Sequence, residues 1–286
     1  MSISASKNSL VRELFVRTAD ENYVTARWCA MNQLDIDFLW LAVHALEKYL
    51  KAVLLLNGHS SRNHSHNIVS LYDAVKTFAA DLLPTLLQRP PGLDVHHWFD
   101  RTPEAFIERL LDNGNADNRY LIYGYSTRLE DLYMLDTMVF AIRRLVCELD
   151  AEEFAGRPGL PAGTHRDRLL ANPHLRRDMS MPLDKLLAST EDTPKRRAAL
   201  NLNLPFAPNY PHEPMAAVIS AVNPVILRRI MDPLASDNRE WAAEGVDLAR
   251  WFLANVQVPR GRGGVPGVAE EIQSAIDAAA ARHGLP

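Results

Sequence analysis

Apolar residues recur at helical spacing through most of the chain, and the clearest stripe lies in residues 35–57. The side chains that share one face of this segment are Phe38, Leu39, Ala42, Ala45, Leu46, Tyr49, Leu50 and Val53. Such a stripe is typical of a helix packed against a partner helix. Asp35 and Asp37 favour a helix start, and Gly58 favours a stop. We expect the opposite face, which carries Trp40, His44, Glu47, Lys48 and Lys51, to be exposed.

The same periodicity predicts helices along the rest of the chain. In the first half they cover about 8–32, 102–111 and 118–149. A further helix in this half begins with Ser65 or His66 as its N-cap and ends near Phe78. In the second half they lie near 183–188, 193–200, 216–234 with a break at Pro224, 238–256 and 268–282. Proline and glycine at 156–163 indicate a boundary, and those at 260–267 indicate a loop. No strand-like alternation of useful length appears, so we expect an all-α protein with domains at 8–150 and 165–286.

Composition and charge narrow the class of protein. The chain is 47% hydrophobic, enough for a real core, and carries a net charge of -4. Residues 1–150 account for this excess, with 15 basic and 19 acidic side chains. Avid binding to phosphate backbones usually needs a basic excess, so contact with nucleic acid would rest on a local patch. We expect the basic pairs to lie on polar helix edges; they are at 143–144, 176–177, 196–197 and 228–229.

The two cysteines and the absence of a long apolar stretch indicate the cellular compartment of the protein. Cys29 and Cys147 lie inside apolar helical patterns, which favours two small buried hydrophobes over a disulfide. The chain shows no signal-peptide pattern and no stretch that would span a bilayer. A cytoplasmic protein without membrane contact is the simplest interpretation.

Several short stretches of the first half, taken together, resemble one known family. They are residues 26–27 (Ala-Arg), 44–54 (His-Ala-Leu-Glu-Lys-Tyr-Leu-Lys-Ala-Val-Leu) with Gly58, 65–68 (Ser-His-Asn-Ile) with Leu71, and 118–120 (Asn-Arg-Tyr). In this order they resemble the HEPN domain, named for higher eukaryotes and prokaryotes nucleotide-binding, over residues of about 8–150. The resemblance implies an up-and-down helical bundle that pairs as a homodimer. Residues 165–286 would be a helical extension of unknown type.

Many HEPN domains are metal-independent ribonucleases whose signature is an arginine followed, after four to six residues, by a histidine. The histidine acts as acid or base on the ribose 2′-hydroxyl, and the arginine stabilises the phosphate charge. The spacing occurs at Arg89 and His96 and again at Arg168 and His174. Proline lies inside both stretches, which does not suit a helical motif. We therefore interpret both as accidents of composition.

The resemblance implies that the signature should begin at Arg119, where the chain reads Arg-Tyr-Leu-Ile-Tyr-Gly-Tyr. Tyr123 or Gly124 stands where histidine is expected. Tyrosine does not exchange protons near neutral pH without a large pKa shift. Family branches that pair with nucleotidyltransferases carry Arg-Tyr at this point. Arg119, Tyr120, Tyr123 and Tyr125 are therefore candidates for binding a nucleotide or RNA.

A second set of candidates lies in the polar loop 59–66 and on the helix before it. Arg62, His64 and His66 could contact a phosphate there, and Lys48 and Lys51 add two positive charges on one helix face.

Metal binding is an alternative for the same loop. His64 and His66 would need His96, His97 or Asp100 as further ligands. No two of these stand at an established ligand spacing on a regular element, and no carboxylate pair accompanies them. We expect no metal site and no cofactor.

Three functions remain open at this point. The first is a HEPN-type accessory module that binds a nucleotide, RNA or a partner protein such as a nucleotidyltransferase, as in bacterial defence or toxin–antitoxin systems. The second is a metal-independent HEPN ribonuclease with a degenerate motif, drawn from Arg62 with His66 or from Arg119 with Tyr123. The third is a structural helical scaffold.

Overall fold

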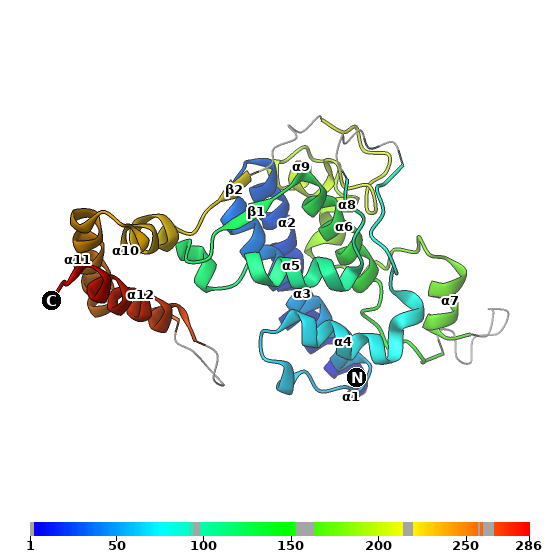
Figure 1. Ribbon diagram of the computed structural model, residues 1–286. Helices are drawn as coiled ribbons and strands as arrows, with labels where there is room; N and C mark the ends of the chain where they lie inside the picture. The colour runs from blue at the N-terminus through cyan, green and yellow to red at the C-terminus, as the bar shows by residue number, and fades with distance from the viewer. Residues whose placement is uncertain are drawn as a thin grey trace. The chain divides into compact units, whose positions relative to one another are not determined.

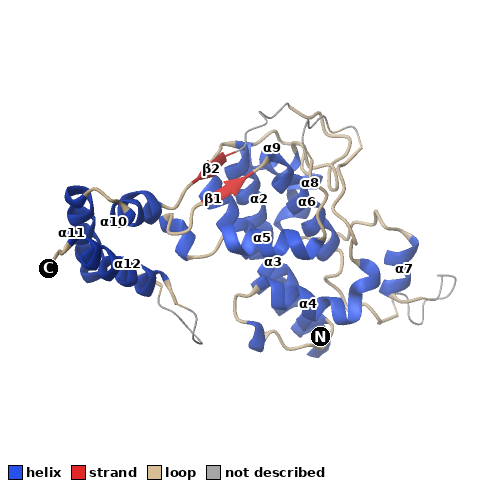
Figure 2. Ribbon diagram, in the orientation of Figure 1, coloured by secondary structure: helices blue, strands red, loops and turns tan. Residues whose placement is uncertain are grey.

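The computed structural model describes residues 3–91, 93, 98–152, 163–213, 220–256, 258–259 and 266–286. The chain divides into two compact units, each described by itself below (Figure 1). The N-terminal unit comprises Met1–Asn115 and Thr127–Ser220, and the C-terminal unit comprises Ala116–Ser126 and Ala221–Pro286. Most of the named elements are helices, so the expected helical class is confirmed at that level (Figure 2).

The N-terminal unit is built from helices joined by short turns and loops. In chain order they are α1 (Ile3–Val11), η1 (Arg12–Val16), α2 (Arg17–Met31), α3 (Asp35–Leu56), η2 (Arg62–His64), α4 (Ile68–Ala79), η3 (Ala80–Leu82), α5 (Pro103–Asn113), α6 (Leu129–Arg143), α7 (His165–Ala171), α8 (Pro182–Ala188) and α9 (Pro194–Leu200). The C-terminal unit holds η4 (Asp117–Tyr120), η5 (Leu227–Met231), α10 (Asp232–Ala235), α11 (Arg239–Asn255) and α12 (Val268–His283). The strands β1 (Tyr125–Thr127) and β2 (Ser220–Val222) pair in a two-stranded sheet, which departs from the strictly all-α expectation.

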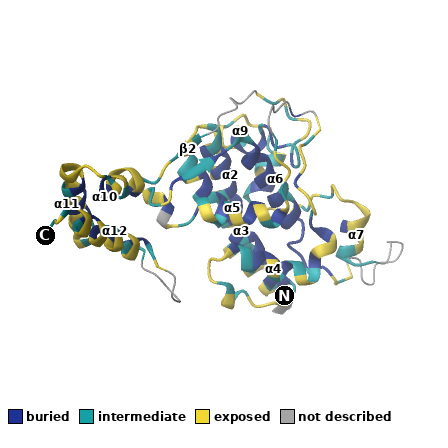
Figure 3. Ribbon diagram, viewed as in Figure 1, coloured by how far each residue is buried: buried dark blue, intermediate teal, exposed yellow. Residues whose placement is uncertain are grey.

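Helix α3 is the centre of the N-terminal unit. It packs along α2 and also contacts α4, α5 and α6. The predicted stripe is buried, and Leu46, Tyr49 and Leu50 are fully excluded from solvent (Figure 3). Helix α3 ends at Leu56, and Gly58 follows with φ +78°, a left-handed conformation that costs glycine little. The predicted helices near 8–32, 35–57, 68–78 and 102–111 are all confirmed.

Buried ion pairs join residues from both halves of the sequence. Arg143 on α6 donates to Asp20 on α2 (Nε to Oδ1, 2.9 Å) and to Asp184 on α8 (Nη2 to Oδ2, 2.8 Å). We call these three residues the Arg143 cluster. A second buried pair joins Arg27 to Asp136. The predicted helix edge at 143–144 is therefore wrong, because both arginines are buried.

These contacts attach residues 163–213 to the first half of the chain. The backbone N–H of Leu183 also donates to Asp20 (2.8 Å), and Arg27 Nε donates to the carbonyl of Ala198 (2.9 Å). The expected domain boundary at 151–165 therefore does not coincide with the division into two units. The predicted linker at 156–163 and the predicted loop at 260–267 lie largely outside the described residues.

The predicted long helix over 118–149 is wrong, because three different elements occupy the segment. η4 ends at Tyr120, the next residue, Leu121, has φ +57°, and α6 begins only at Leu129. Asn118 accepts from the N–H of Tyr123 (3.3 Å) through its side-chain oxygen, and its amide donates to the carbonyl of Gly124. Gly124 has φ +72°, and a Cβ there would lie 2.2 Å from the carbonyl oxygen of Val222. An asparagine-closed loop and a close backbone approach therefore replace the first turns of the helix.

The helices predicted near 183–188, 193–200, 238–256 and 268–282 are confirmed as α8, α9, α11 and α12. The helix predicted over 216–234 is wrong in its first part, because β2 occupies Ser220–Val222; residues 214–219 lie outside the described residues. In the C-terminal unit, Ile230, Val246, Ile272 and Ile276 form the centre of a separate hydrophobic core.

Two sequence expectations concern cysteines and membranes. Cys29 and Cys147 are both buried and free, as expected. Within the described part of the chain, none of the helices combines the length and the apolar character that crossing a bilayer requires.

Candidate functional site

A buried carboxylate on α3 gathers three basic side chains around it. Glu47, whose side chain is only 6% exposed, accepts from Lys51 Nζ at 2.6 Å. Its oxygens also lie 3.0 Å from His66 Nδ1 and 3.3 Å from His44 Nδ1. We call these four residues the Glu47 cluster. The expectation that Glu47 would be exposed on the polar face of its helix is wrong.

Local geometry explains how the cluster forms. His44 and Lys51 stand three residues before and four residues after Glu47, which places all three on one side of α3. The ring of Trp40, one turn earlier, packs edge-on against that of His44, with the centroids 4.2 Å apart. This part of the cluster is therefore a property of the helix alone.

His66 reaches Glu47 from the loop that precedes α4. Asn67, rather than Ser65 or His66 as predicted, caps α4, since its side chain accepts from the N–H of Ser70 (3.0 Å). His64 Nδ1 lies 2.7 Å from the hydroxyl of the same serine. Because Asn67 caps α4, His66 does not have the capping role that we expected, and its imidazole ring contacts the carboxylate of Glu47 instead.

Electrostatics keep Glu47 ionised. Burial alone would raise the pKa of its carboxyl group, but hydrogen bonds from His44 and Lys51 and the charges of Lys51 and His66 lower that pKa to about 2. A carboxylate only accepts hydrogen bonds, so Nδ1 of His66 carries the proton in this contact. The other ring nitrogen, Nε2, belongs to a side chain that is 79% exposed, and in a neutral imidazole it is the hydrogen-bond acceptor.

A carboxylate that orients an exposed imidazole is an arrangement used in acid–base chemistry. The carboxylate fixes the tautomer and stabilises the imidazolium, while the free nitrogen exchanges protons with a bound group. Lys51 brings a positive charge within 2.6 Å of the same carboxylate. The Glu47 cluster can therefore bind an anionic oxygen and move a proton at one exposed atom.

Of the remaining candidates of the N-terminal unit, Lys48 follows Glu47 on α3 and Arg62 lies on η2. Lys48 is half-buried and donates to the side-chain oxygen of Asn22, and burial lowers the pKa of its amine, although the charges of Glu47 and Glu21 oppose that shift. Arg62 is exposed on η2. The solvated face predicted for Lys48 and Lys51 is thus a bonded and partly buried one.

The candidates that follow Asn118 belong to the C-terminal unit. Arg119 and Tyr120 lie on η4 and are exposed, and Tyr120 is the most exposed of the large apolar or aromatic side chains described. Tyr123 is exposed in the loop that Asn118 closes, and Tyr125 is half-buried on β1. Arg119 is therefore not placed in a helix that could carry the arginine–histidine signature.

The two accidental arginine–histidine spacings differ in how far they are described. His96 lies outside the described residues, as does His97. Arg168 is on α7, but His174 follows the end of that helix in an exposed loop. Among the described residues, no group of three histidine, cysteine or acidic side chains is placed to hold a metal ion.

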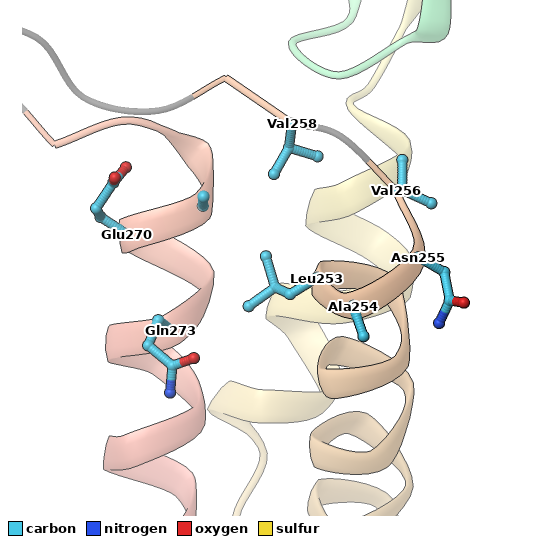
Figure 4. Close-up of a pocket in the computed structure, with 8 residues that line it drawn as sticks. Leu253, Ala254, Asn255, Val256, Val258, Glu270 and Gln273 are labelled. Carbon is cyan, nitrogen blue, oxygen red and sulfur yellow. The ribbon is translucent and has the colours of Figure 1, made fainter.

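The C-terminal unit contains a hollow of about 580 Å³ between the end of α11 and the start of α12 (Figure 4). Leu253 and Val258 point into it from one side, and Glu270 and Gln273 line the α12 side. Glu270 already accepts from the N–H of Gly267 at 3.0 Å, which caps α12. Glu270 is the charged group among the described residues that line the hollow, and because it is already hydrogen-bonded, these residues offer less chemistry than the Glu47 cluster.

Sequence reasoning found Lys51 and His66 but missed the carboxylate that joins them. The signal was present in the i,i+4 order of Glu47 and Lys51, which we interpreted as an exposed pair. Comparison with known proteins adds nothing to this picture: no family model matches the chain, and neither a curated protein nor a solved structure resembles it significantly.

Proposed function

We propose that the chain is a HEPN-type helical module that binds a phosphate-bearing ligand, a nucleotide or RNA, at the Glu47 cluster. One observation carries this proposal. Glu47 and Lys51 come from one stretch of the resemblance, His66 comes from another, and their side chains meet within 3.0 Å.

The arrangement of helices supports the same proposal. Helices α2, α4 and α6 each contact α3, which supports a helical bundle of the kind that the resemblance implies. We also propose that the chain forms a homodimer and binds a nucleotidyltransferase partner, as the resemblance implies. Sedimentation at micromolar concentration would give twice the chain mass of 32.1 kDa, and a mass equal to it would contradict the dimer.

The local charge fits a phosphate. Lys48, Lys51 and Arg62 supply three positive charges on α3 and the following loop, against the carboxylates of Glu47 and of Glu21, whose charge acts on Lys48. The chain as a whole carries a net charge of -4, so this patch is a local exception. Positive side chains neutralise phosphate oxygens and release counterions, which makes such binding sensitive to salt.

The test is a titration of fluorescent single-stranded RNA and of a fluorescent nucleotide with the full chain. Lys51→Ala should weaken binding of the preferred ligand by about tenfold, since a hydrogen bond to a charged group contributes about 1.5–3 kcal/mol. Lys185→Ala removes an exposed lysine on α8 and serves as the matched control. Equal affinities for the two variants would exclude this cluster as the ligand site.

The contact between Glu47 and His66 favours a second function, metal-independent cleavage of RNA. The imidazole would act as acid or base, and Lys51 with Arg62 would stabilise the phosphate. Incubation of RNA with the protein and a chelator measures this directly. Chelator-insensitive cleavage that is lost in His66→Ala would establish the ribonuclease, whereas binding without cleavage would leave the accessory module.

A further inference from the structure

A large groove crosses another face of the N-terminal unit. Its walls come from the segment that follows η3, from α6, from the end of α7 with the loop after it, and from residues 204–208. Its volume is about 1160 Å³. Sites for small ligands usually enclose about 300–1,000 Å³, so the groove is sized for a longer occupant.

Much of the lining of the groove is aliphatic and rich in proline. Leu170 is 47% exposed and Leu86 is 38% exposed, although both are large apolar side chains. Pro84, Pro173 and Pro205 also line it. Exposed apolar side chains gathered in one concave surface mark an interaction site, whereas single ones need no explanation.

Several of the residues that line the groove are basic. Arg89, Arg144 and Arg176 line it together with His174. Asp81 is the acidic residue among the lining side chains, and Arg166 already holds it with two hydrogen bonds of 2.8 and 3.1 Å. Among the described lining residues, Arg144 and Arg176 therefore give the groove a positive charge, although the net charge of the chain is negative.

Arg144 gives this charge a fixed position. The residue is only 8% exposed, and one of its terminal nitrogens donates to the carbonyl of Pro173. Its Nε is buried and has no hydrogen-bond acceptor among the described residues. A buried donor without an acceptor is costly, and the guanidinium that carries it lines the groove, where a carboxylate would add a charge-assisted contact.

We propose that this groove docks an acidic, aliphatic peptide segment of a partner protein. Its carboxylates would bind Arg144 and Arg176, and its leucine or isoleucine side chains would cover Leu86 and Leu170. Such a pattern of apolar anchors with charged flanks is a common mode of peptide recognition. The proposal is independent of the ligand bound at the Glu47 cluster.

Nucleic acid fits the groove less well, although it is also anionic. Single-stranded RNA is held largely by stacking of bases on aromatic or arginine planes. The rings that line the groove, Phe140 and Phe206, pack edge to face with centroids 5.2 Å apart, and Phe206 is buried. The exposed apolar side chains that line the groove, Leu86 and Leu170, are aliphatic, and they suit leucine side chains better than bases.

The experiment uses fluorescence anisotropy with the full chain and three labelled probes of equal length. The first is a pool of peptides composed of Asp, Glu, Leu and Ile; the second replaces its acidic residues with Lys; the third is a single-stranded oligouridylate. We expect the acidic pool alone to bind. Arg176→Glu and Leu170→Ser should each weaken that binding by about tenfold or more, the size of one lost charge-assisted contact or anchor.

Matched controls come from the C-terminal unit. Arg229→Glu makes the same change of charge on η5, and Leu248→Ser removes an equally exposed leucine from α11. Because all four positions are exposed, the variants should fold, which circular dichroism checks. The proposal is overturned if the acidic pool does not bind, if the controls weaken binding as much as the groove variants, or if the oligouridylate binds through Arg176 instead.

Discussion

Two ionic clusters lie on neighbouring helices of the N-terminal unit, and they differ in their access to water. The Arg143 cluster is closed: Asp20, Arg143 and Asp184 are all buried. The Glu47 cluster has an equally buried carboxylate, but its partner His66 is 79% exposed. Buried ion pairs satisfy each other and fix the packing of elements, whereas a buried charge with an exposed partner can act on a bound molecule. We therefore expect the first cluster to contribute to stability, and the ligand chemistry that we propose belongs to the second.

The largest effect should come from breaking the closed cluster. Arg143→Met leaves Asp20 and Asp184 as buried charges without their shared partner, which costs about 3–5 kcal/mol. Urea unfolding measures this loss, with Arg228→Met on η5 as an exposed control that should stay within about 0.5 kcal/mol. A loss below about 1 kcal/mol would show that the two aspartates do not depend on this arginine.

Acid should reduce the stability that the Glu47 cluster contributes, by less than the loss expected for Arg143→Met and only within a defined pH range. The pKa of Glu47 is about 2 in the folded chain, against an ordinary value of 4.5. The lowered pKa stabilises the fold above pH 4.5, and this stabilisation is lost as the pH falls toward 2.

Glu47→Gln removes that contribution. The difference in unfolding free energy between the wild type and this variant should be largest above pH 4.5 and should shrink continuously toward pH 2. Urea unfolding at several pH values measures it. A difference that does not change with pH would contradict the lowered pKa.

A smaller effect should come from removing the N-cap of α4, which positions His66 in the Glu47 cluster. Asn67→Ala removes the N-cap of α4, at a cost of about 1 kcal/mol. Because His66 precedes this cap, ligand binding should weaken as well. Asn238→Ala removes the corresponding cap of α11 in the C-terminal unit and should cost a similar amount without affecting binding. If both variants bound the ligand equally, the cap would have no role in placing His66.

The sequence predicts those features that depend on neighbours within a turn or two. The stripe on α3, its end before Gly58 and the helices α4, α5, α8, α11 and α12 follow from local spacing. The break after Asn118 also has local causes, but its asparagine and Gly124 are weaker signals than the apolar periodicity around them. That periodicity suggested a helix, and the close approach of Val222, about a hundred residues away in the sequence, decided against it.

For a similar reason, the sequence predicts some members of the Glu47 cluster but not the burial of its carboxylate. Lys51 follows Glu47 on the same helix, and this order is equally typical of an exposed pair. Burial of Glu47 depends on the rest of the fold around α3, which no local pattern encodes. Arg143 shows the same limit more strongly, since its partners Asp20 and Asp184 lie 123 and 41 residues away.

The central claim is that the open cluster binds a ligand, and His66 tests it most directly. His66→Ala removes an exposed side chain, so its unfolding free energy should stay within about 0.5 kcal/mol of the wild type. Its affinity for the labelled nucleotide or RNA should fall by about tenfold, the size of one charge-assisted hydrogen bond. His174→Ala, which removes another exposed histidine of the same unit, should change neither quantity. Wild-type affinity in His66→Ala, together with unchanged stability, would contradict the claim.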